Sequence, residues 1–149
     1  MPVKVIVFNK CMQLAHDKIA LLEKILDELK ESGMNETKST AGDKHETALA
    51  MIQIEQENKR RQLKEVLAQY ERLKRIDIST KPLSVGIGSL VKTNKAWFFI
   101  SQPIGKITVD NETVMAISPQ SPLGIKLMGL VKDDSAELNG IKYTIEIIE

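Results

Sequence analysis

The hydrophobic residues in the first half of the chain recur at alternating spacings of three and four. One series is Met12, Ala15, Ile19, Leu22, Leu26 and Leu29. A second is Leu49, Ile52, Gln56, Lys59, Leu63, Val66, Tyr70 and Leu73, with two polar members near its middle. Each series forms one apolar stripe along a helix, and such a helix needs a partner to be stable in water. The pattern predicts two long helices that pack against each other.

A segment rich in turn formers separates the two series. Residues 33–42 read Gly-Met-Asn-Glu-Thr-Lys-Ser-Thr-Ala-Gly and interrupt the helical spacing. A short break between two matched helices favours an antiparallel hairpin over a parallel dimeric coiled coil. Folding about residue 39 brings Leu29 opposite Leu49, and roughly 30 residues of helix extend about 45 Å.

The second half of the chain changes to short apolar runs divided by turn residues. Three strand pairs are predicted, namely 88–92 with 96–100, 106–109 with 112–117, and 136–138 with 141–148. Asn139-Gly140, between the last two strands, is the strongest hairpin signal in the chain. These runs predict a small, mostly antiparallel sheet.

One short helix is predicted between the second and third strand pairs. Ser121 fits the N-cap, Pro122 fits the first helical position, and Gly129 fits the C-terminus. The apolar residues of this helix, expected to face the sheet, are Leu123, Leu127 and Met128.

Proline and glycine mark where the two halves meet. No proline lies between Val3 and Lys81, and six of the eight glycines lie at or beyond Gly86. We therefore predict an α+β chain: an antiparallel coiled-coil hairpin at residues 1–78 with its tip at about 33–46, a linker at 79–84, and a sheet domain with one short helix at 85–149.

Composition narrows the classes of function. The chain has 149 residues, a formal net charge of +1 and a single cysteine, Cys11. Near-neutral charge argues against wholesale coating of nucleic acid or anionic membrane, and one cysteine excludes an intrachain disulfide. No apolar run approaches the roughly 20 residues of a membrane span, and we see no signal-peptide cleavage pattern. We expect a cytoplasmic monomer with no membrane partner.

The residue types that usually carry chemistry form no catalytic set. His16 and His45 lack metal-ligand spacing, and Cys11 beside the helical seam is expected to be core packing. The aromatic run at 97–99 is interpreted as core, because no clustered arginine or lysine accompanies it. The basic residues at 59–75 are expected on exposed helix faces, where they aid solubility or follow an acidic channel.

One pair of carboxylates has two interpretations. Asp43 and Glu46 lie three residues apart at the start of the second helix, next to the hairpin tip. That spacing is typical of a capping box, which is the interpretation that the residues alone favour. It also brings two carboxylates close enough to share one Mg²⁺, which prefers oxygen ligands and would need further ligands from a partner.

Two segments resemble the Gre transcript-cleavage factors of bacterial RNA polymerase. At the tip, Gly42-Asp-Lys-His-Glu-Thr-Ala48 is similar to the family motif Gly-Asp-x-x-Glu-Asn-Ala. Near the end, residues 116–124, Ala-Ile-Ser-Pro-Gln-Ser-Pro-Leu-Gly, resemble the family's Ile-Ser-x-x-Ser-Pro segment, and residues 139–145 resemble its closing hairpin.

The resemblance implies a role for each segment. A domain resembling FKBP would dock at the mouth of the polymerase secondary channel through Ser121, Pro122 and Leu123. The coiled coil would enter the channel, where Asp43 and Glu46 hold an Mg²⁺ shared with the polymerase active site. Lys38 and Lys44 would contact phosphates near the RNA 3′ end. The chain would have no tightly bound cofactor and would be no enzyme itself, because it stimulates the intrinsic nuclease of the polymerase on backtracked RNA.

Departures from the family motif keep alternatives open. Thr47 replaces the motif's asparagine, and Leu49-Ala50 follow where the family continues with an acidic residue and a tyrosine. A channel-binding regulator or inhibitor without efficient cleavage is therefore the alternative within the family. A non-catalytic coiled-coil adaptor, whose tip is only a cap, is a second one. A prolyl isomerase is disfavoured, since the resemblance runs to Gre factors.

Overall fold

The computed structural model describes the backbone of residues 2–37 and 42–149 and the side chains of residues 2–35 and 46–149. It begins with two long helices, α1 (Lys4–Thr37) and α2 (Gly42–Lys74). The chain forms two compact units, one of residues Ala15–Tyr70 and one of residues Met1–Leu14 with Glu71–Glu149. Within the described residues, no helix is both long enough and apolar enough to cross a membrane.

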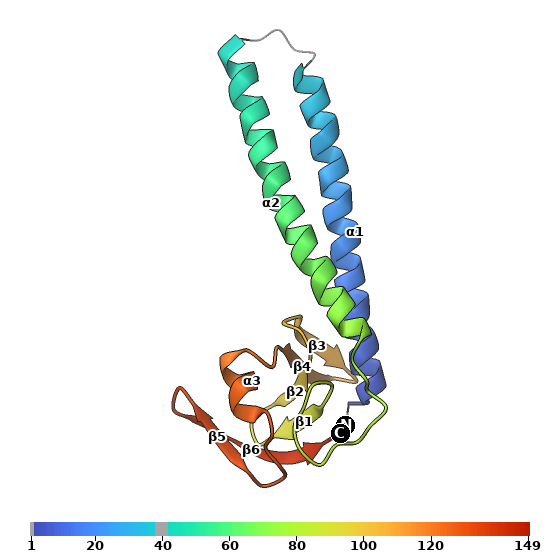
Figure 1. Ribbon diagram of the computed structural model, residues 1–149, viewed down its shortest axis with the longest axis vertical. Helices are drawn as coiled ribbons and strands as arrows, with labels where there is room; N and C mark the ends of the chain where they lie inside the picture. The colour runs from blue at the N-terminus through green and yellow to red at the C-terminus, as the bar shows by residue number, and fades with distance from the viewer. Residues whose placement is uncertain (1, 38–41) are drawn as a thin grey trace. The chain divides into compact units, whose positions relative to one another are not determined.

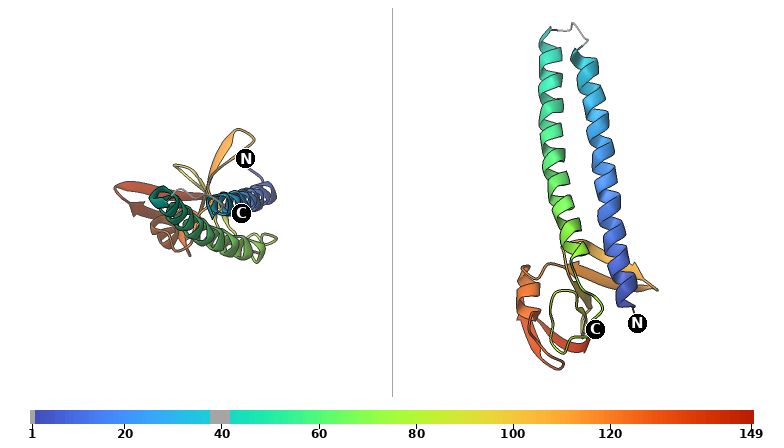
Figure 2. Two further views of the ribbon diagram at one scale, coloured as in Figure 1. Left: turned by 90° about the horizontal axis from the view of Figure 1, so that it is seen from above. Right: turned by 45° about the vertical axis from the view of Figure 1, so that its right-hand side comes forward.

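The first unit is the antiparallel helical hairpin that the heptad pattern predicts. Figures 1 and 2 show α1 and α2 side by side and running in opposite directions. Ala15 and Leu22 of α1 and Val66 of α2 are buried, and the other seam positions of this unit are half-buried. The polar seam residue Lys59 is half-buried too, and its ammonium pairs with Glu55 one turn earlier at 3.4 Å. The hairpin is thus held by the apolar stripe of each helix facing the other.

The two helices extend further toward the tip than the turn formers predict. Residues 33–37 were expected to belong to the turn, but α1 continues as a helix to Thr37. A Cβ built on Gly33 would lie 3.7 Å from Cγ2 of Ile52 in α2, so the glycine backbone packs against the partner helix. Packing against a partner outweighs the weak local preference of a single glycine, and this lengthens the helix.

The second unit contains a six-stranded sheet and a short helix, α3 (Pro122–Leu127). Its strands are β1 (Leu90–Thr93), β2 (Trp97–Ile100), β3 (Gly105–Val109), β4 (Glu112–Ile117), β5 (Ser135–Leu138) and β6 (Ile141–Ile148). They lie in the order β3-β4-β2-β1-β6-β5, and every neighbouring pair is antiparallel except β2 with β4. The predicted α+β fold is confirmed.

One part of the core of this second unit lies between the sheet and α3. Phe98, Ile145 and Leu127 belong to one buried cluster, with Leu123 and Met128 packed against it. This confirms that the apolar face of α3 contacts the sheet. The aromatic run at 97–99 is buried, as predicted for core packing.

The beginning of α1 and the end of α2 belong to the sheet unit. Val7 and Cys11 of α1 and Leu73 of α2 are completely buried. The division into units therefore falls inside the two helices, whereas we predicted a linker at 79–84. The predicted division into domains at residues 1–78 and 85–149 stays a prediction.

Candidate functional site

The hairpin tip carries the predicted carboxylate pair at the beginning of α2. Because α2 begins at Gly42, both Asp43 and Glu46 have helical backbone. Residues three apart in a helix lie on one face, so the two positions share a helix face. The side chain of Glu46 is exposed, while that of Asp43 lies outside the described side chains. Carboxylates in the first turn are also favoured by the helix dipole.

The predicted RNA-contacting lysines fall in the least described part of the chain. Lys38 lies outside the described residues, and Lys44 is described only as backbone within α2. Within the described residues, no group of three or more histidine, cysteine or acidic side chains could hold a metal ion. The described residues at the tip thus supply at most a pair of ligands, and a bound Mg²⁺ would need the others from a partner.

The predicted docking segment is a tightly bonded corner at the start of α3. Ser121 is the N-cap, and its hydroxyl oxygen accepts a hydrogen bond from the Gly124 backbone N–H at 3.0 Å. The same hydroxyl donates to the Ser118 carbonyl at 2.7 Å. Pro122 occupies the first position of the helix, as predicted. The corner is rigid because one hydroxyl satisfies backbone groups on both sides of the turn.

Two glycines shape this corner. A Cβ on Gly124 would lie 2.1 Å from the Ser118 carbonyl oxygen, so only glycine fits there. Gly129 follows the helix with φ of +82°, in the left-handed region that often ends a helix. The predicted closure of the helix at Gly129 is confirmed.

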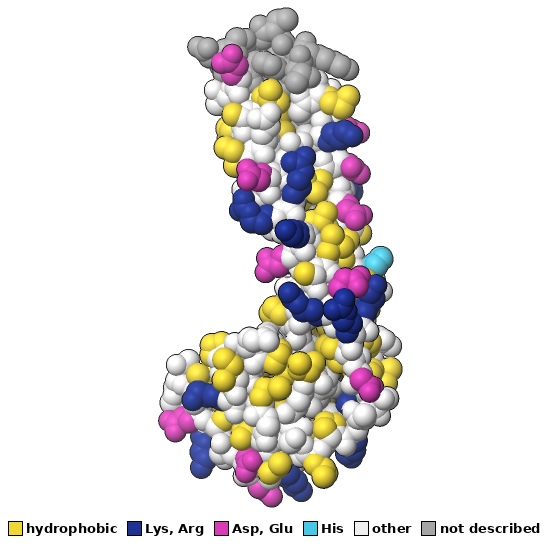
Figure 3. Space-filling model, in the orientation of Figure 1, with side chains coloured by type: hydrophobic (Ala, Val, Ile, Leu, Met, Phe, Trp, Pro, Cys, Tyr) yellow, Lys and Arg dark blue, Asp and Glu magenta, His cyan; other side chains and the backbone are white. Residues whose placement is uncertain are grey.

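Exposed apolar side chains surround the corner. Pro122 is exposed and Leu123 is half-buried against the core, while Ile125 on the outer face of α3 is 63% exposed. Beside α3, Leu83 is 90% exposed and Val131 is 44% exposed. Figure 3 shows hydrophobic side chains spread over the face of this unit that carries α3.

The chain segments at 83–85 and 129–131 lie against each other. Ser84 forms an isolated antiparallel bridge with Val131, and the Val85 N–H donates to the Leu130 carbonyl at 2.8 Å. We predicted no role for Leu83, which lay in the predicted linker at 79–84, or for Val131. For Leu83, its place between Pro82 and Ser84 in a predicted surface loop was the available signal.

The surroundings of the remaining candidate side chains indicate structural rather than chemical roles. Burial raises the pKa of the Cys11 thiol to about 12, which leaves it protonated and unreactive at neutral pH. The ring of His16 lies 6.4 Å from that of Tyr70 on the hairpin surface. The basic residues of α2 alternate with acidic ones in Figure 3, and Arg61 pairs with Glu57 at 3.6 Å. Such exposed pairs contribute mainly to solubility.

Comparisons with known proteins find a likeness at the level of structure. No protein-family model matches the chain, and no curated protein matches it. A solved structure described as that of the transcription factor Gfh1 is similar over 94% of this chain and 90% of the other, with 18% sequence identity and a TM-score of 0.32. A score at that level is too low to carry an assignment of function.

Proposed function

We propose that this chain is a Gre-type transcription factor that binds the secondary channel of bacterial RNA polymerase and stimulates cleavage of backtracked RNA. The proposal rests on the positions of two motifs in the fold, which match the roles that the resemblance to Gre factors implies for them. The Gly-Asp-x-x-Glu motif at 42–46 lies at the tip of a long helical hairpin. The Ile-Ser-x-x-Ser-Pro motif at 117–122 lies at the cap of the short helix in the sheet unit.

The hairpin has the form that entry into a narrow channel requires. It is a pair of helices with an apolar seam, and its outer face is polar and charged. At its tip the exposed Glu46 shares a helix face with Asp43, and no described residue nearby completes a metal site. A carboxylate pair of this kind is useful only where a partner supplies further ligands.

The tip residues would act together with groups of the polymerase. Asp43 and Glu46 would hold an Mg²⁺ jointly with the polymerase aspartates, and the ion would activate a water for attack on the RNA phosphodiester. Lys44 and Lys38, six residues apart in sequence, would neutralise phosphate charge near the RNA 3′ end. The factor therefore supplies ligands and charge, while the nuclease activity stays that of the polymerase.

Docking is assigned to the corner at the start of α3. The hydrogen-bonded turn at Ser121 leads into the exposed ring of Pro122, and the half-buried Leu123 packs against the core of the unit. Ile125 adds apolar surface on α3. Val131 adds an exposed apolar side chain on segment 129–131, which follows the C-terminal end of α3, and Leu83 adds another on segment 83–85, which pairs with it. Exposed apolar groups around a rigid, hydrogen-bonded turn are typical of a protein-binding surface.

The test is RNA cleavage in backtracked elongation complexes of the cognate polymerase. The natural chain is compared with Asp43→Ser/Glu46→Gln, which removes both charges and keeps residues able to cap a helix. The matched control is Glu23→Gln/Glu65→Gln, which removes two exposed carboxylates from the hairpin away from the tip. We expect rapid cleavage with the natural chain and the control, and a loss of at least a hundredfold with the tip variant.

The other outcomes distinguish the alternatives. If the natural chain slows transcription without cleavage and still binds the polymerase, it is a channel-occupying regulator, which Leu49 and Ala50 in place of the family's acidic residue and tyrosine would favour. If it neither alters transcription nor co-purifies with the polymerase, the Gre interpretation is wrong and a coiled-coil adaptor remains.

A further inference from the structure

Strand β3 lies at an open edge of the sheet. It is the first strand in the order β3-β4-β2-β1-β6-β5, so only β4 pairs with it. The two strands are joined by Asp110 and Asn111, with φ of 48° and 66°. A two-residue turn with both φ values positive makes the flanking pair, Val109 with Glu112, hydrogen-bonded.

The backbone groups of alternate β3 residues therefore point away from the sheet. In an antiparallel pair, bonded and non-bonded positions alternate, so Ile107 bonds to β4 like Val109. The backbone N–H and C=O of Lys106 and Thr108 face outward. The Thr108 carbonyl confirms this direction, because it accepts a hydrogen bond from Nζ of Lys10 at 2.8 Å. No other hydrogen bond reaches these outward groups within the described part of the chain.

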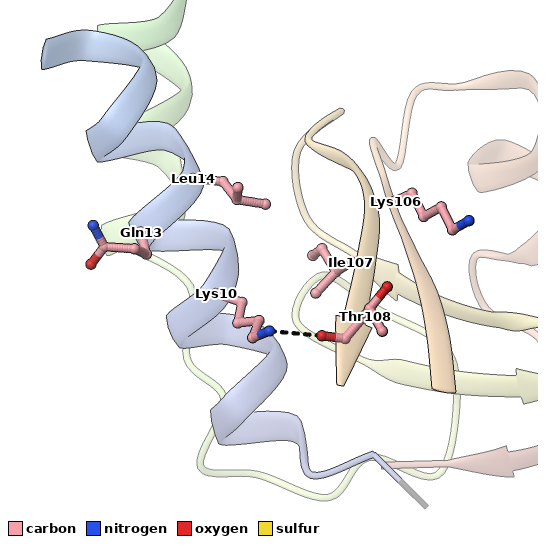
Figure 4. A pocket seen from close by; sticks show the side chains of 6 residues that line it. All are labelled: Lys10, Gln13, Leu14, Lys106, Ile107 and Thr108. Carbon is pink, nitrogen blue, oxygen red and sulfur yellow. Dashed lines mark hydrogen bonds between the residues drawn. The ribbon is translucent and has the colours of Figure 1, made fainter. Parts of the chain in front are cut away.

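A hollow lies between this edge and the beginning of α1. Its volume is about 320 Å³, and the residues that line it are Lys10, Gln13, Leu14, Lys106, Ile107 and Thr108. Figure 4 shows Lys10 and Leu14 on the side of α1 toward β3, and Ile107 on the side of β3 toward α1. Leu14 is 44% exposed, so the hollow has an apolar wall beside the open backbone edge.

The charge at this edge is positive. Lys10 and Lys106 are exposed, and within the described residues neither ammonium forms an ion pair. Lys10 donates instead to the neutral Thr108 carbonyl. A carboxylate is the stronger partner for an ammonium, and an acidic group entering here would replace a neutral acceptor by a charged one.

These features favour one kind of occupant over a second copy of the chain. Two β3 strands paired edge to edge would bring Lys10 and Lys106 close to the same lysines of the other copy, and like charges disfavour that pairing. An extended segment with acidic residues at two neighbouring positions would pair its backbone with Lys106 and Thr108. Its two carboxylates would lie on opposite faces of the added strand, one toward Lys10 on the side of α1 and the other toward Lys106, which points away from α1 in Figure 4.

We propose that the β3 edge is a docking site for an extended acidic peptide segment of a partner protein, which adds to the sheet as a seventh strand beside β3. The site lies in the sheet unit and shares no residue with the hairpin tip or with the corner at residues 118–131. The proposal is independent of the proposed transcription role, since its test contains no polymerase.

The test uses the full chain and a blocked hexapeptide of four valines with two neighbouring glutamates at its centre, which point to opposite faces when the peptide is extended. Titration followed by amide NMR and calorimetry is expected to shift the 105–109 amides and to slow solvent exchange of the Lys106 and Thr108 amides. Lys10→Glu/Lys106→Glu is expected to weaken binding at least tenfold. The control Lys95→Glu/Lys142→Glu changes the net charge equally at exposed lysines elsewhere in the unit and is expected to bind as the natural chain does.

A backbone variant separates strand pairing from simple charge attraction. Thr108→Pro removes one outward N–H and is therefore expected to lose binding. The fold should tolerate the change, because proline is tolerated on the open side of an edge strand. Circular dichroism checks its folding, and the charge variants carry the test if it does not fold. The proposal is overturned if a control peptide with lysine in place of each glutamate binds equally well, if charge reversal leaves binding unchanged, or if the glutamate peptide does not bind. In the last case Lys10 and Lys106 serve only to guard the edge against aggregation.

Discussion

The ring of Phe8 in α1 meets the ring of Phe99 in β2 edge to face, with centroids 6.5 Å apart and planes at 81°. Phe99 is completely buried, whereas Phe8 is half-buried. The contact joins residues far apart in sequence within the sheet unit. The first turns of α1 therefore contribute to the same core as the strands.

Removing either ring tests that contribution. Phe99→Ala is expected to lower the free energy of unfolding by about 3–5 kcal/mol, since it empties a fully buried site. Phe8→Ala is expected to cost less, because its ring is partly exposed. In a double-mutant cycle by urea denaturation, the pair should show a coupling of about 0.5–1.5 kcal/mol. A coupling near zero would mean that the two rings touch without stabilising each other.

Gly33 offers a stabilising substitution in the hairpin. It lies inside α1, and a Cβ there would make ordinary contact with Ile52 at 3.7 Å. Gly33→Ala should therefore raise the free energy of unfolding by about 0.5–1 kcal/mol, because alanine loses less backbone entropy in a helix. Ala20→Gly, at an exposed position of the same helix, should lower it by a similar amount. Helical signal during thermal unfolding measures both, and destabilisation by Gly33→Ala would contradict the packing described here.

The corner before α3 should be far less tolerant. Gly124→Ala places a methyl group 2.1 Å from the Ser118 carbonyl oxygen and is expected to destabilise the sheet unit by about 1–3 kcal/mol. Ser121→Ala removes the cap and should cost about 1 kcal/mol. The exposed Ile125→Ala should be close to neutral in stability. Denaturant unfolding followed by Trp97 fluorescence ranks the three, and equal effects would show that the cap geometry is unimportant.

The docking to polymerase that we propose should depend on the same corner, but here the exposed Ile125, which matters little for stability, should have a large effect. Ile125→Glu is expected to weaken retention of the chain on immobilised cognate polymerase about tenfold, because it puts a charge into an apolar contact surface. Its folding should be unchanged, since the side chain is 63% exposed. Val5→Glu, at an exposed apolar position of α1, serves as the control and should be retained normally. Normal retention of Ile125→Glu would move the docking surface elsewhere.

One carboxylate gives a pH-dependent signature. The hydroxyl and the backbone N–H of Ser79 both donate to Asp77 and lower its pKa below the ordinary value, with a smaller contribution from Lys4. A lowered pKa means that the stabilising contribution is complete above the unfolded-state pKa and is lost as pH falls through the folded-state pKa. Ser79→Ala should raise the Asp77 pKa toward its ordinary value in an NMR titration. An unchanged pKa would mean that the Ser79 hydroxyl does not cause the shift, which would leave the backbone N–H of residue 79 and Lys4 as its causes.

The fold could be predicted from sequence where one local pattern decided it. The heptad spacing of Leu22 and Val66 placed both on the hairpin seam, and Asn139-Gly140 marked the turn between β5 and β6. The extent of the helices could not be predicted, because Gly33 is a turn former locally and packs against Ile52 only once the hairpin exists.

The candidate site divides in the same way. Ser121 and Pro122 were predictable as a cap because that motif is local in sequence. Leu83 and Val131 were not, since they become neighbours only through a bridge between segments far apart in the chain. The outward direction of the Thr108 carbonyl likewise follows from strand order and register, which no local pattern specifies.

The position of β6 has a consequence for biosynthesis. This strand pairs with both β1 and β5, and Leu90 exchanges backbone hydrogen bonds of 3.0 and 2.8 Å with Glu149. As the chain leaves the ribosome, the helical hairpin can form at once, whereas β1 keeps an unpaired side until residues 141–148 emerge. A nascent chain in this state exposes a strand edge to its neighbours. A product truncated before residue 141 should therefore combine a folded hairpin with an aggregation-prone sheet.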